Sequence, residues 1–234
     1  MFDWDSMKNK IILADNKDVL KYIPDKFFDL SIVDPPYGIG ADKENESMSC
    51  GMRIDGTQRI MKTWNNPKPK QYKKSDWDKY IPDKKYFDEL FRISKNQIIW
   101  GGNYFTEYLK PTGGWVVWDK KVPEKMSLSK CELAWETQFN SIKIFRYLWA
   151  GYKKEKPEER FHPTQKPVAL YRWLLQNYAK PSDKIIDTHS GSGSLACACH
   201  LEGFDFLAIE KDEDYHSASV KRLEELRSQG RLFI

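Results

Sequence analysis

The stretch KIIDTHSGSGSLACA, residues 184 to 198, decides the fold. Its apolar start, Lys184 to Ile186, predicts a buried strand that ends in Asp187. The glycine-rich turn Ser190–Gly193 follows, and Ser194 to Leu201 has the small and apolar residues of a buried helix. A strand, a glycine turn and a helix in this order predict an α/β fold, in which backbone amides and the helix N-terminus approach a ligand closely.

The next apolar run supports a nucleoside-type ligand at this turn. Residues Phe206 to Ile209 predict a second strand, which ends in Glu210, about seventeen residues beyond Gly193. An acid at this place is suited to binding the two hydroxyls of a ribose. No G-K-[ST] follows the glycines, so a Walker loop and ATP are disfavoured. A plain glycine turn beside a surface glutamate is the structural alternative.

A second strand-ending motif is VDPPYGIG, residues 33 to 40. The apolar run Leu30 to Val33 predicts a buried strand that stops at Asp34. Pro35 and Pro36 stiffen the turn, and Tyr37 brings an exposed ring to the same end of the strand. Taken alone, the motif also fits an ordinary turn after a strand.

Strands and helices alternate along the rest of the chain. Further strands are expected at 11–14, 97–100, 115–118 and 141–149, and further helices at 86–93, 166–178 and 215–226. This order predicts a mostly parallel twisted sheet flanked by helices. With 234 residues, the chain suits a single domain, 1–234, with a polar loop insertion at about 41–80.

The insertion is strongly basic. Between Thr57 and Lys74 there are six basic residues and no acids, and Trp64 lies among them. The six are Arg59, Lys62, Lys68, Lys70, Lys73 and Lys74. A solvated loop and an arm that contacts a phosphate backbone are both consistent with this composition.

Targeting and metal signals are weak in this sequence. The N-terminus, MFDWDSMKNK, lacks an apolar signal core, and no run approaches the roughly 18 apolar residues of a membrane span. The four cysteines show no zinc-binding spacing. A cytoplasmic protein without a membrane partner or a metal is therefore expected.

Together the motifs resemble the S-adenosylmethionine-dependent DNA amino-methyltransferases, in the permuted class that carries D-P-P-Y before the cofactor loop. Asp34-Pro35-Pro36-Tyr37 comes early, and the stretch from Asp187 to Gly193 comes late. Between them stands HPTQKP, residues 162 to 167, an element that this class carries just before its cofactor strand. The resemblance covers nearly the whole chain except residues 41–80 and about 120–160.

The resemblance implies a Rossmann-like fold and assigns roles to individual residues. Asp34 and the Pro35 carbonyl would accept the two N–H groups of an amine on a flipped base, with Pro36 stiffening the turn and Tyr37 stacking on the base. The expected cofactor ligands are Asp15, Asp34, His162, Thr164, Gln165, Lys166, Asp187, His189, Gly191, Gly193 and Glu210. The expected partner is double-stranded DNA, and members of the class often pair as homodimers.

The chain departs from the class at two places. The cofactor loop reads Asp187-Thr188-His189 where Asp-Pro-Phe is usual, so His189 is either a ring against the cofactor or a satisfied core histidine. The target-recognition segment, about 120–160, is short. Asp34 at the first position favours adenine N6 over cytosine N4, and it argues against RNA or a protein amide as substrate. A non-catalytic DNA-binding subunit that retains the fold is the alternative from another class.

Overall fold

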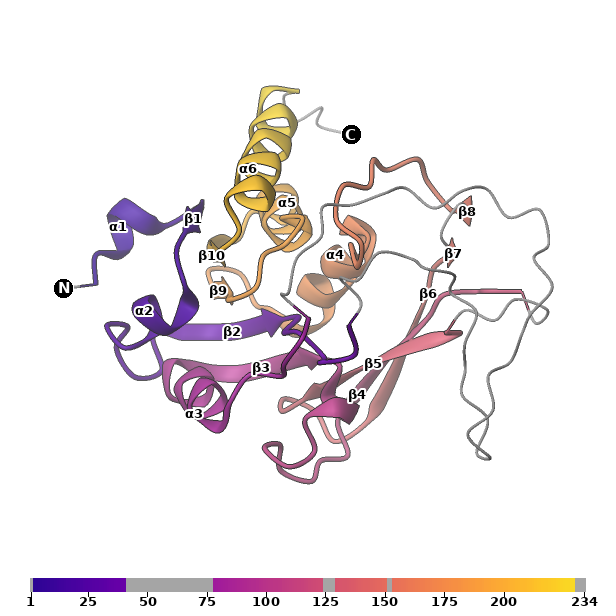
Figure 1. The fold of residues 1–234 in the computed structure, drawn as a ribbon, viewed down its shortest axis with the longest axis horizontal. Helices are drawn as coiled ribbons and strands as arrows, with labels where there is room; N and C mark the ends of the chain where they lie inside the picture. The colour runs from indigo at the N-terminus through magenta and orange to yellow at the C-terminus, as the bar shows by residue number, and fades with distance from the viewer. Residues whose placement is uncertain (1, 41–77, 124–128, 151–152, 230–234) are drawn as a thin grey trace.

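The structure is a computed structural model that describes residues 2–40, 78–123, 129–150 and 153–229 (Figure 1). The helices are α1 (Trp4–Met7), α2 (Asn16–Leu20), α3 (Lys84–Ile93), α4 (Val168–Tyr178), α5 (Ser194–Glu202) and α6 (Glu213–Ser228), with a 3-10 turn at Gly102–Tyr104. The strands are β1 (Lys10–Leu13), β2 (Phe28–Val33), β3 (Ser94–Trp100), β4 (Trp115–Asp119), β5 (Cys131–Glu136), β6 (Ile142–Arg146), β7 (Trp149–Ala150), β8 (Lys153–Lys154), β9 (Lys184–Asp187) and β10 (Asp205–Glu210).

Eight of the strands form one sheet in the order β1-β10-β9-β2-β3-β5-β4-β6. The first five strands in this order run parallel to one another. Strand β5 is antiparallel to both β3 and β4, while β6 is again parallel to β4. The expected α/β fold with a mostly parallel sheet flanked by helices is therefore confirmed (Figure 1).

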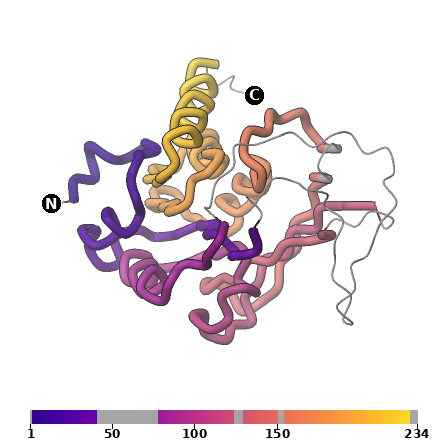
Figure 2. Tube along the Cα trace, viewed as in Figure 1, coloured from indigo at the N-terminus to yellow at the C-terminus, as the bar shows by residue number. Residues whose placement is uncertain are grey.

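Helices cover both faces of the sheet. Alternate residues of β10 belong to different cores: Phe206 and Ala208 pack with α4 and α5, whereas Leu207 and Ile209 pack with α2 and α3. Figures 1 and 2 show the resulting layers, with α5 and α6 on one side of the strands and α3 on the other. The parallel strands are apolar on both faces because both faces are buried.

The chain reverses its winding direction between β2 and β9. From β2 the chain goes on to β3 on one side, and from β9 it goes on to β10 on the other. In open α/β sheets, ligands bind outside the carboxyl ends of the strands at such a switch point. Asp34 follows β2 directly and Asp187 ends β9, so both acids lie at this crevice.

Two differences from the sequence expectations concern the distal half of the sheet. The strand expected at 141–149 is two strands, β6 and β7. Strand β5 was not expected, because Glu132 and Glu136 interrupt its apolar pattern. In the structure, Glu132 is partly buried and Glu136 is fully buried. Both β5 and β6 come from the segment expected to recognise the target, and they lie in the main sheet. Among the described helices, none has the length and apolar character needed to cross a membrane.

Candidate active site

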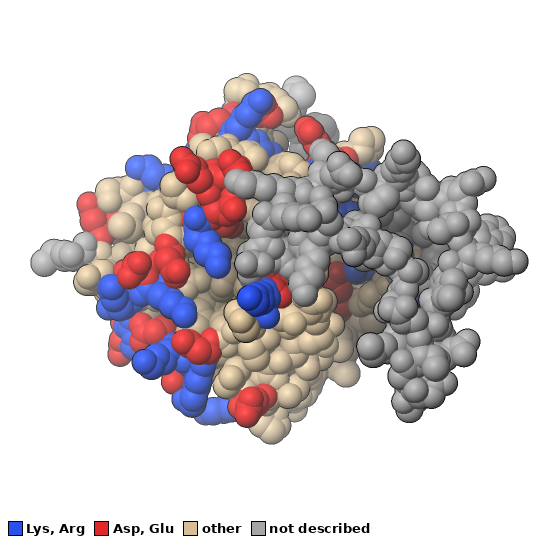
Figure 3. All heavy atoms as spheres, viewed as in Figure 1, with Lys and Arg blue, Asp and Glu red and all other residues tan. Residues whose placement is uncertain are grey.

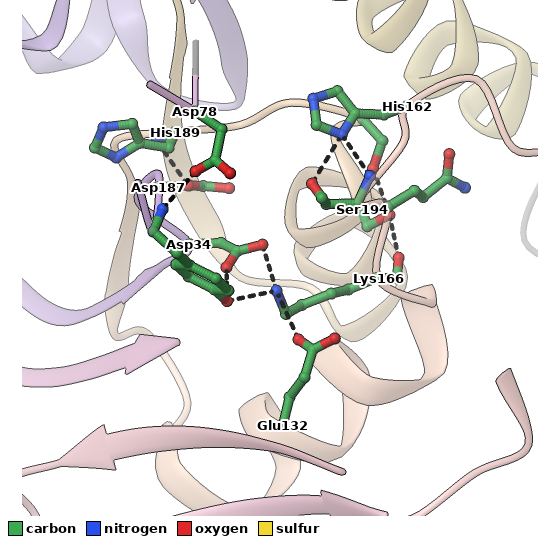
Figure 4. A network of polar contacts seen from close by, with 12 residues as sticks. Asp34, Asp78, Glu132, His162, Lys166, Asp187, His189 and Ser194 are labelled. Atoms are coloured by element: carbon green, nitrogen blue, oxygen red, sulfur yellow. Dashed lines mark hydrogen bonds and ion pairs between the residues drawn. The ribbon is translucent and has the colours of Figure 1, made fainter. Parts of the chain in front are cut away.

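The turn after β2 is held by one buried carboxylate. Asp78 is 1% exposed, and its Oδ1 accepts the backbone N–H groups of Tyr37 (2.7 Å) and Gly38 (3.0 Å). The Asp78 carbonyl accepts a third N–H, from Gly40, at 3.1 Å. The D-P-P-Y turn is thus fixed from outside its own sequence (Figure 4).

Two donors bind the Asp34 carboxylate. The Tyr37 hydroxyl donates to Oδ1 at 2.5 Å, and the Lys166 ammonium donates to Oδ2. Burial raises the pKa of Asp34, while the Lys166 charge opposes that rise. The pKa of the Tyr37 phenol is raised strongly by burial and by the Asp34 charge, so the phenol stays protonated and acts as a donor.

The Tyr37 ring is less exposed than its sequence suggests. It is half-buried and stacks on Tyr104, with ring centroids 5.0 Å apart and planes 15° apart. Gly101, after β3, makes this possible, because a Cβ on that glycine would lie 2.2 Å from Tyr37 Cε1. Gly101 therefore allows the close approach of this ring.

Lys166 faces Asp34, although the resemblance assigns it to the cofactor. Its Nζ lies 3.2 Å from both the Tyr37 hydroxyl and Glu132 Oε2, and Figure 4 shows it between Asp34 and Glu132. Burial lowers the pKa of Lys166, but Asp34 and Glu132 outweigh that effect and the net shift is upward. Burial alone would raise the pKa of Glu132, yet Lys166 and Lys120 lower it to about 2. Sequence reasoning did not select Glu132, because it lies in the unexpected strand β5.

The glycine turn and Glu210 are joined by hydrogen bonds. Gly191 (φ 49°) and Gly193 (φ 67°) both have left-handed backbone conformations, which favour glycine. Glu210 Oε2 accepts the Gly191 N–H at 2.6 Å, and Oε1 accepts the Asp212 N–H at 2.9 Å. Burial raises the pKa of Glu210. Each carboxylate oxygen has a second lone pair for a further donor.

Asp187 is a buried acid with few partners. It is 5% exposed, and its Oδ1 accepts the His189 N–H at 3.0 Å. Burial raises the pKa of Asp187 to about 8, and the nearby charges of Asp34 and Glu210 add to this rise. A cationic group brought into this site would favour the ionised form of Asp187.

His189 has protein partners at both ring nitrogens. Asn16 Nδ2 lies 3.0 Å from Nε2, while Thr188 Oγ1 lies 3.0 Å from Nδ1. The Tyr86 ring meets the imidazole edge-on at 5.1 Å. Burial, together with the Lys211 charge, lowers the pKa of His189 to about 3, so the ring is neutral at pH 7. This is the arrangement of a satisfied histidine; contact with a cofactor stays a prediction.

The side chains of the HPTQKP element contact several different partners. His162 lies beside the glycine turn, since a Cβ on Gly191 would be 3.5 Å from its Nε2. Its Nδ1 lies 3.2 Å from Thr164 Oγ1, and burial with two nearby cations lowers the His162 pKa to about 3. The Gln165 amide bonds to Glu158 (3.2 Å) and to the Glu159 carbonyl (2.8 Å), and its contact with the cofactor stays a prediction.

The remaining candidates lie at the edge of the site or outside the described residues. Asp15 is exposed and caps α2 by accepting the Lys17 N–H at 2.9 Å. The basic residues from Arg59 to Lys74 lie outside the described residues. Over the described part of the face in Figure 3, basic and acidic side chains are intermixed. Among the described residues, no group of three or more His, Cys, Asp or Glu side chains is arranged for a metal ion.

Known proteins share this fold over nearly the whole chain. The type II methyltransferase M.HinfI of Haemophilus influenzae is 25% identical over 94% of this chain and 69% of its own length. The M1.HpyAVI–SAM complex is 17% identical, with a TM-score of 0.55 over 91% of this chain and 98% of that one. The cytosine-N4-specific PvuII DNA methyltransferase is 11% identical, with a TM-score of 0.56 over 94% of this chain and 91% of that one.

A family model described as DNA methylase, whose name covers both N6 and N4 methyltransferases, matches residues 58–221. The match includes HPTQKP, the glycine turn and Glu210, and it begins after Tyr37. It spans well over half of the chain. On that match, the chain belongs to the DNA methylase family.

Proposed function

We propose that this protein transfers a methyl group from S-adenosylmethionine to the exocyclic amine of a base flipped out of double-stranded DNA, with adenine N6 as the target. One observation carries the proposal. Asp34, an acceptor suited to an amine, and Asp187, beside a glycine turn suited to a nucleoside, end neighbouring strands at the switch point of the sheet. Membership of the DNA methylase family gives this juxtaposition its chemistry.

The residues around the glycine turn fit the cofactor. Glu210 has lone pairs left for the ribose hydroxyls, and Asp187 is a buried acid suited to a cationic group. Ser190 Oγ is buried and has no hydrogen-bond partner among the described residues, so a bound ligand would satisfy it. His162 flanks the same turn. S-adenosylmethionine supplies an electrophilic methyl group on a positively charged sulfur.

The D-P-P-Y turn prepares the nucleophile. The lone pair of an exocyclic amine is delocalised into the ring, which makes the amine a poor nucleophile. Asp34 accepts one N–H and the Pro35 carbonyl accepts the other, which turns the lone pair toward the methyl group. The Tyr37 hydroxyl now donates to Asp34 Oδ1, so the arriving amine must replace it or share that oxygen. The freed Tyr37 ring then stacks on the base.

The choice of adenine rests on Asp34 at the first position of the motif. Cytosine N4 is the second candidate, because it also presents an amine beside a ring nitrogen, and the PvuII enzyme of similar fold is cytosine-N4-specific. A non-catalytic subunit is disfavoured by the intact Asp34, glycine turn and Glu210. We assign the whole chain to one catalytic domain, with the basic insertion contacting DNA phosphates and a homodimer as the expected assembly.

Expression in a methylation-free bacterial host tests the proposal. Total DNA is digested to nucleosides for mass spectrometry and also sequenced with direct detection of modified bases. We expect N6-methyladenine in a fixed sequence context, absent when Asp34→Ala replaces the wild type. Detection of N4-methylcytosine would instead identify cytosine as the target base. Unmodified DNA, together with no methyl transfer by purified protein, would contradict the enzymatic function.

A further inference from the structure

Four alternating charges lead away from the catalytic turn. Asp34 contacts Lys166, Lys166 contacts Glu132, and Glu132 contacts Lys120, which follows β4. The first three side chains are largely buried, with 18%, 3% and 24% of their surface exposed, respectively. Ion pairs at this depth cost desolvation free energy and are weak evidence for stability. The position of this row next to Asp34 therefore suggests a role in the reaction.

Lys166 is held from all sides. Its ammonium contacts Asp34, Glu132 Oε2 at 3.2 Å and the Tyr37 hydroxyl at 3.2 Å, and it lies 5.3 Å from the centre of the Trp100 ring. The ammonium has three protons, and three oxygens surround it. The ammonium forms ion pairs with Asp34 and Glu132 at the same time, so the two carboxylates share one cation.

We propose that Lys166 and Glu132 are positioning residues for Asp34. Lys166 keeps this carboxylate ionised and fixed in orientation, and Glu132 takes a share of the same ammonium, so that Asp34 stays a strong acceptor for the target amine. This inference rests on the methyl transfer proposed above. It assigns a function to β5, a strand that no motif of the sequence marks.

Of the other titratable groups that face Asp34, three tyrosines stay neutral, whereas Asp187, with a pKa of about 8, titrates near neutral pH. Tyr37 in the same turn, Tyr86 of α3 and Tyr171 of α4 all have pKa values raised by burial, so they stay neutral. Asp187 at the end of β9 also faces Asp34 and is present unchanged in every variant below. Differences between variants therefore report on Lys166 and Glu132.

The test compares three variants with the wild type. Glu132→Gln keeps the shape and an acceptor oxygen but removes the charge, and Lys166→Met removes the ammonium. Glu202→Gln is the matched control, because Glu202 is a similarly buried carboxylate (15% exposed) paired with Arg172 Nε at 2.5 Å, away from Asp34. Two readouts are used: the pH dependence of single-turnover methyl transfer, and the ¹³C titration of the Asp34 carboxyl in cofactor-free protein.

The two changes should move the titration of Asp34 in opposite directions. Lys166→Met should raise the Asp34 pKa by about 1–3 units and slow transfer at least tenfold near neutral pH. Glu132→Gln should lower the Asp34 pKa, because the ammonium then serves Asp34 alone, and should also slow transfer. Glu202→Gln should leave both readouts at wild-type values.

If the Asp34 pKa shifts in the same direction in both variants, or shifts in neither, the ion pairs of Lys166 and Glu132 are merely structural. Either result would overturn the inference. Lys166→Arg, which keeps the charge, guards against a folding defect in Lys166→Met and should titrate like the wild type. If wild-type protein transfers no methyl group, the proposed function fails. The carboxyl titration still decides the inference in that case, because it needs no activity.

Discussion

The Asp34 carboxylate already bonds to Tyr37 on one oxygen and to Lys166 on the other. Neither contact is visible as a pattern in the sequence, where Lys166 lies 132 residues away. The sequence predicts Asp34 as the acceptor for an amine, whereas the structure shows which two donors bind its carboxylate. In the proposed reaction, the arriving amine exchanges with one of these donors.

Replacing Asp34 should separate chemistry from cofactor binding. We expect Asp34→Ala to lower the transfer rate by at least about 10²–10³-fold, because the amine loses the group that orients its lone pair. Cofactor affinity should change little, since in the proposed reaction Asp34 faces the base more than the cofactor. Rapid-quench kinetics and calorimetry measure the two quantities. A loss of cofactor affinity equal to the loss of activity would contradict this assignment.

Glu210 should carry much of the cofactor affinity. Its replacement in Glu210→Ala leaves the ribose hydroxyls without a charged acceptor and removes the bond to Gly191, a loss of roughly 1.5–3 kcal/mol for a charge-assisted hydrogen bond. Calorimetric titration with S-adenosylmethionine measures this loss, and Glu213→Ala in the first turn of α6 is the control. Wild-type affinity in Glu210→Ala would rule out the ribose role.

Asp187 should make folding stability depend on pH. Its folded pKa of about 8 lies above the ordinary value of 3.8, so between these values the folded protein keeps a proton that the unfolded chain loses. The stability contributed by this group is complete below about pH 4 and is lost as the pH rises toward 8. Asp187→Asn should therefore gain on the wild type by up to about 1.4 kcal/mol per pH unit in that window. Urea unfolding of both proteins at pH 5 to 8 measures the difference, and a constant difference would contradict the raised pKa.

At the scale of elements, the glycine turn ahead of α5 joins three parts of the fold. A Cβ on Gly193 would lie 2.9 Å from Ser219 Cβ in α6 and 3.1 Å from Ile11 Cδ1 in β1. Arg222 of α6 donates to the Ser192 carbonyl at 2.9 Å and to Glu158 at 2.5 Å. Packing within the fold thus shapes the turn.

The two glycines of the turn should differ in their cost of substitution. Both Gly191→Ala and Gly193→Ala put a side chain in the left-handed region, at about 1–2 kcal/mol each. Only Gly193→Ala adds a clash, because the nearest atom to a Cβ on Gly191 is at an ordinary 3.5 Å. Urea unfolding should therefore show a clearly larger loss of stability for Gly193→Ala, and equal losses would contradict the packing role.

The sequence predicts the elements of the parallel half of the sheet better than those of the antiparallel half. Strands β2, β9 and β10 are apolar runs that end in acids or glycine turns. Such runs are easy to predict because parallel strands are buried on both faces of the sheet. Strand β5 carries Glu132 and Glu136, which are stabilised by partners distant in sequence or by backbone amides. Likewise, HPTQKP marks a place in the fold, but a motif does not say in which direction Lys166 extends. Both the formation of β5 and the direction of the Lys166 side chain depend on contacts made only in the folded protein.

For the whole molecule, the switch point between β2 and β9 determines where ligands meet. The expected basic arm, Arg59 to Lys74, belongs to the connection that follows the D-P-P-Y motif in the sequence. The arm lies outside the described residues, so its contact with DNA stays a prediction. Phosphate contacts of this kind would supply affinity without sequence choice.

Salt dependence tests the arm. Changing Lys68, Lys70, Lys73 and Lys74 to Ala should weaken binding to all DNA sequences alike. It should also flatten the slope of log affinity against log salt by roughly 0.9 for each true contact. Cofactor affinity, measured in parallel, should remain that of the wild type. A slope equal to the wild-type slope would identify the stretch as a solvated loop.

The short segment from His162 to Lys166 touches the glycine turn with its first side chain and Asp34 with its last. A ligand that displaces the His162 ring therefore moves the same short stretch of backbone to which the Lys166 side chain is attached. Any coupling free energy transmitted in this way is reciprocal, so the factor by which the cofactor alters affinity for the base is the factor by which the base alters affinity for the cofactor. In the proposed reaction, coupling of this kind between cofactor and base passes through the five residues 162–166.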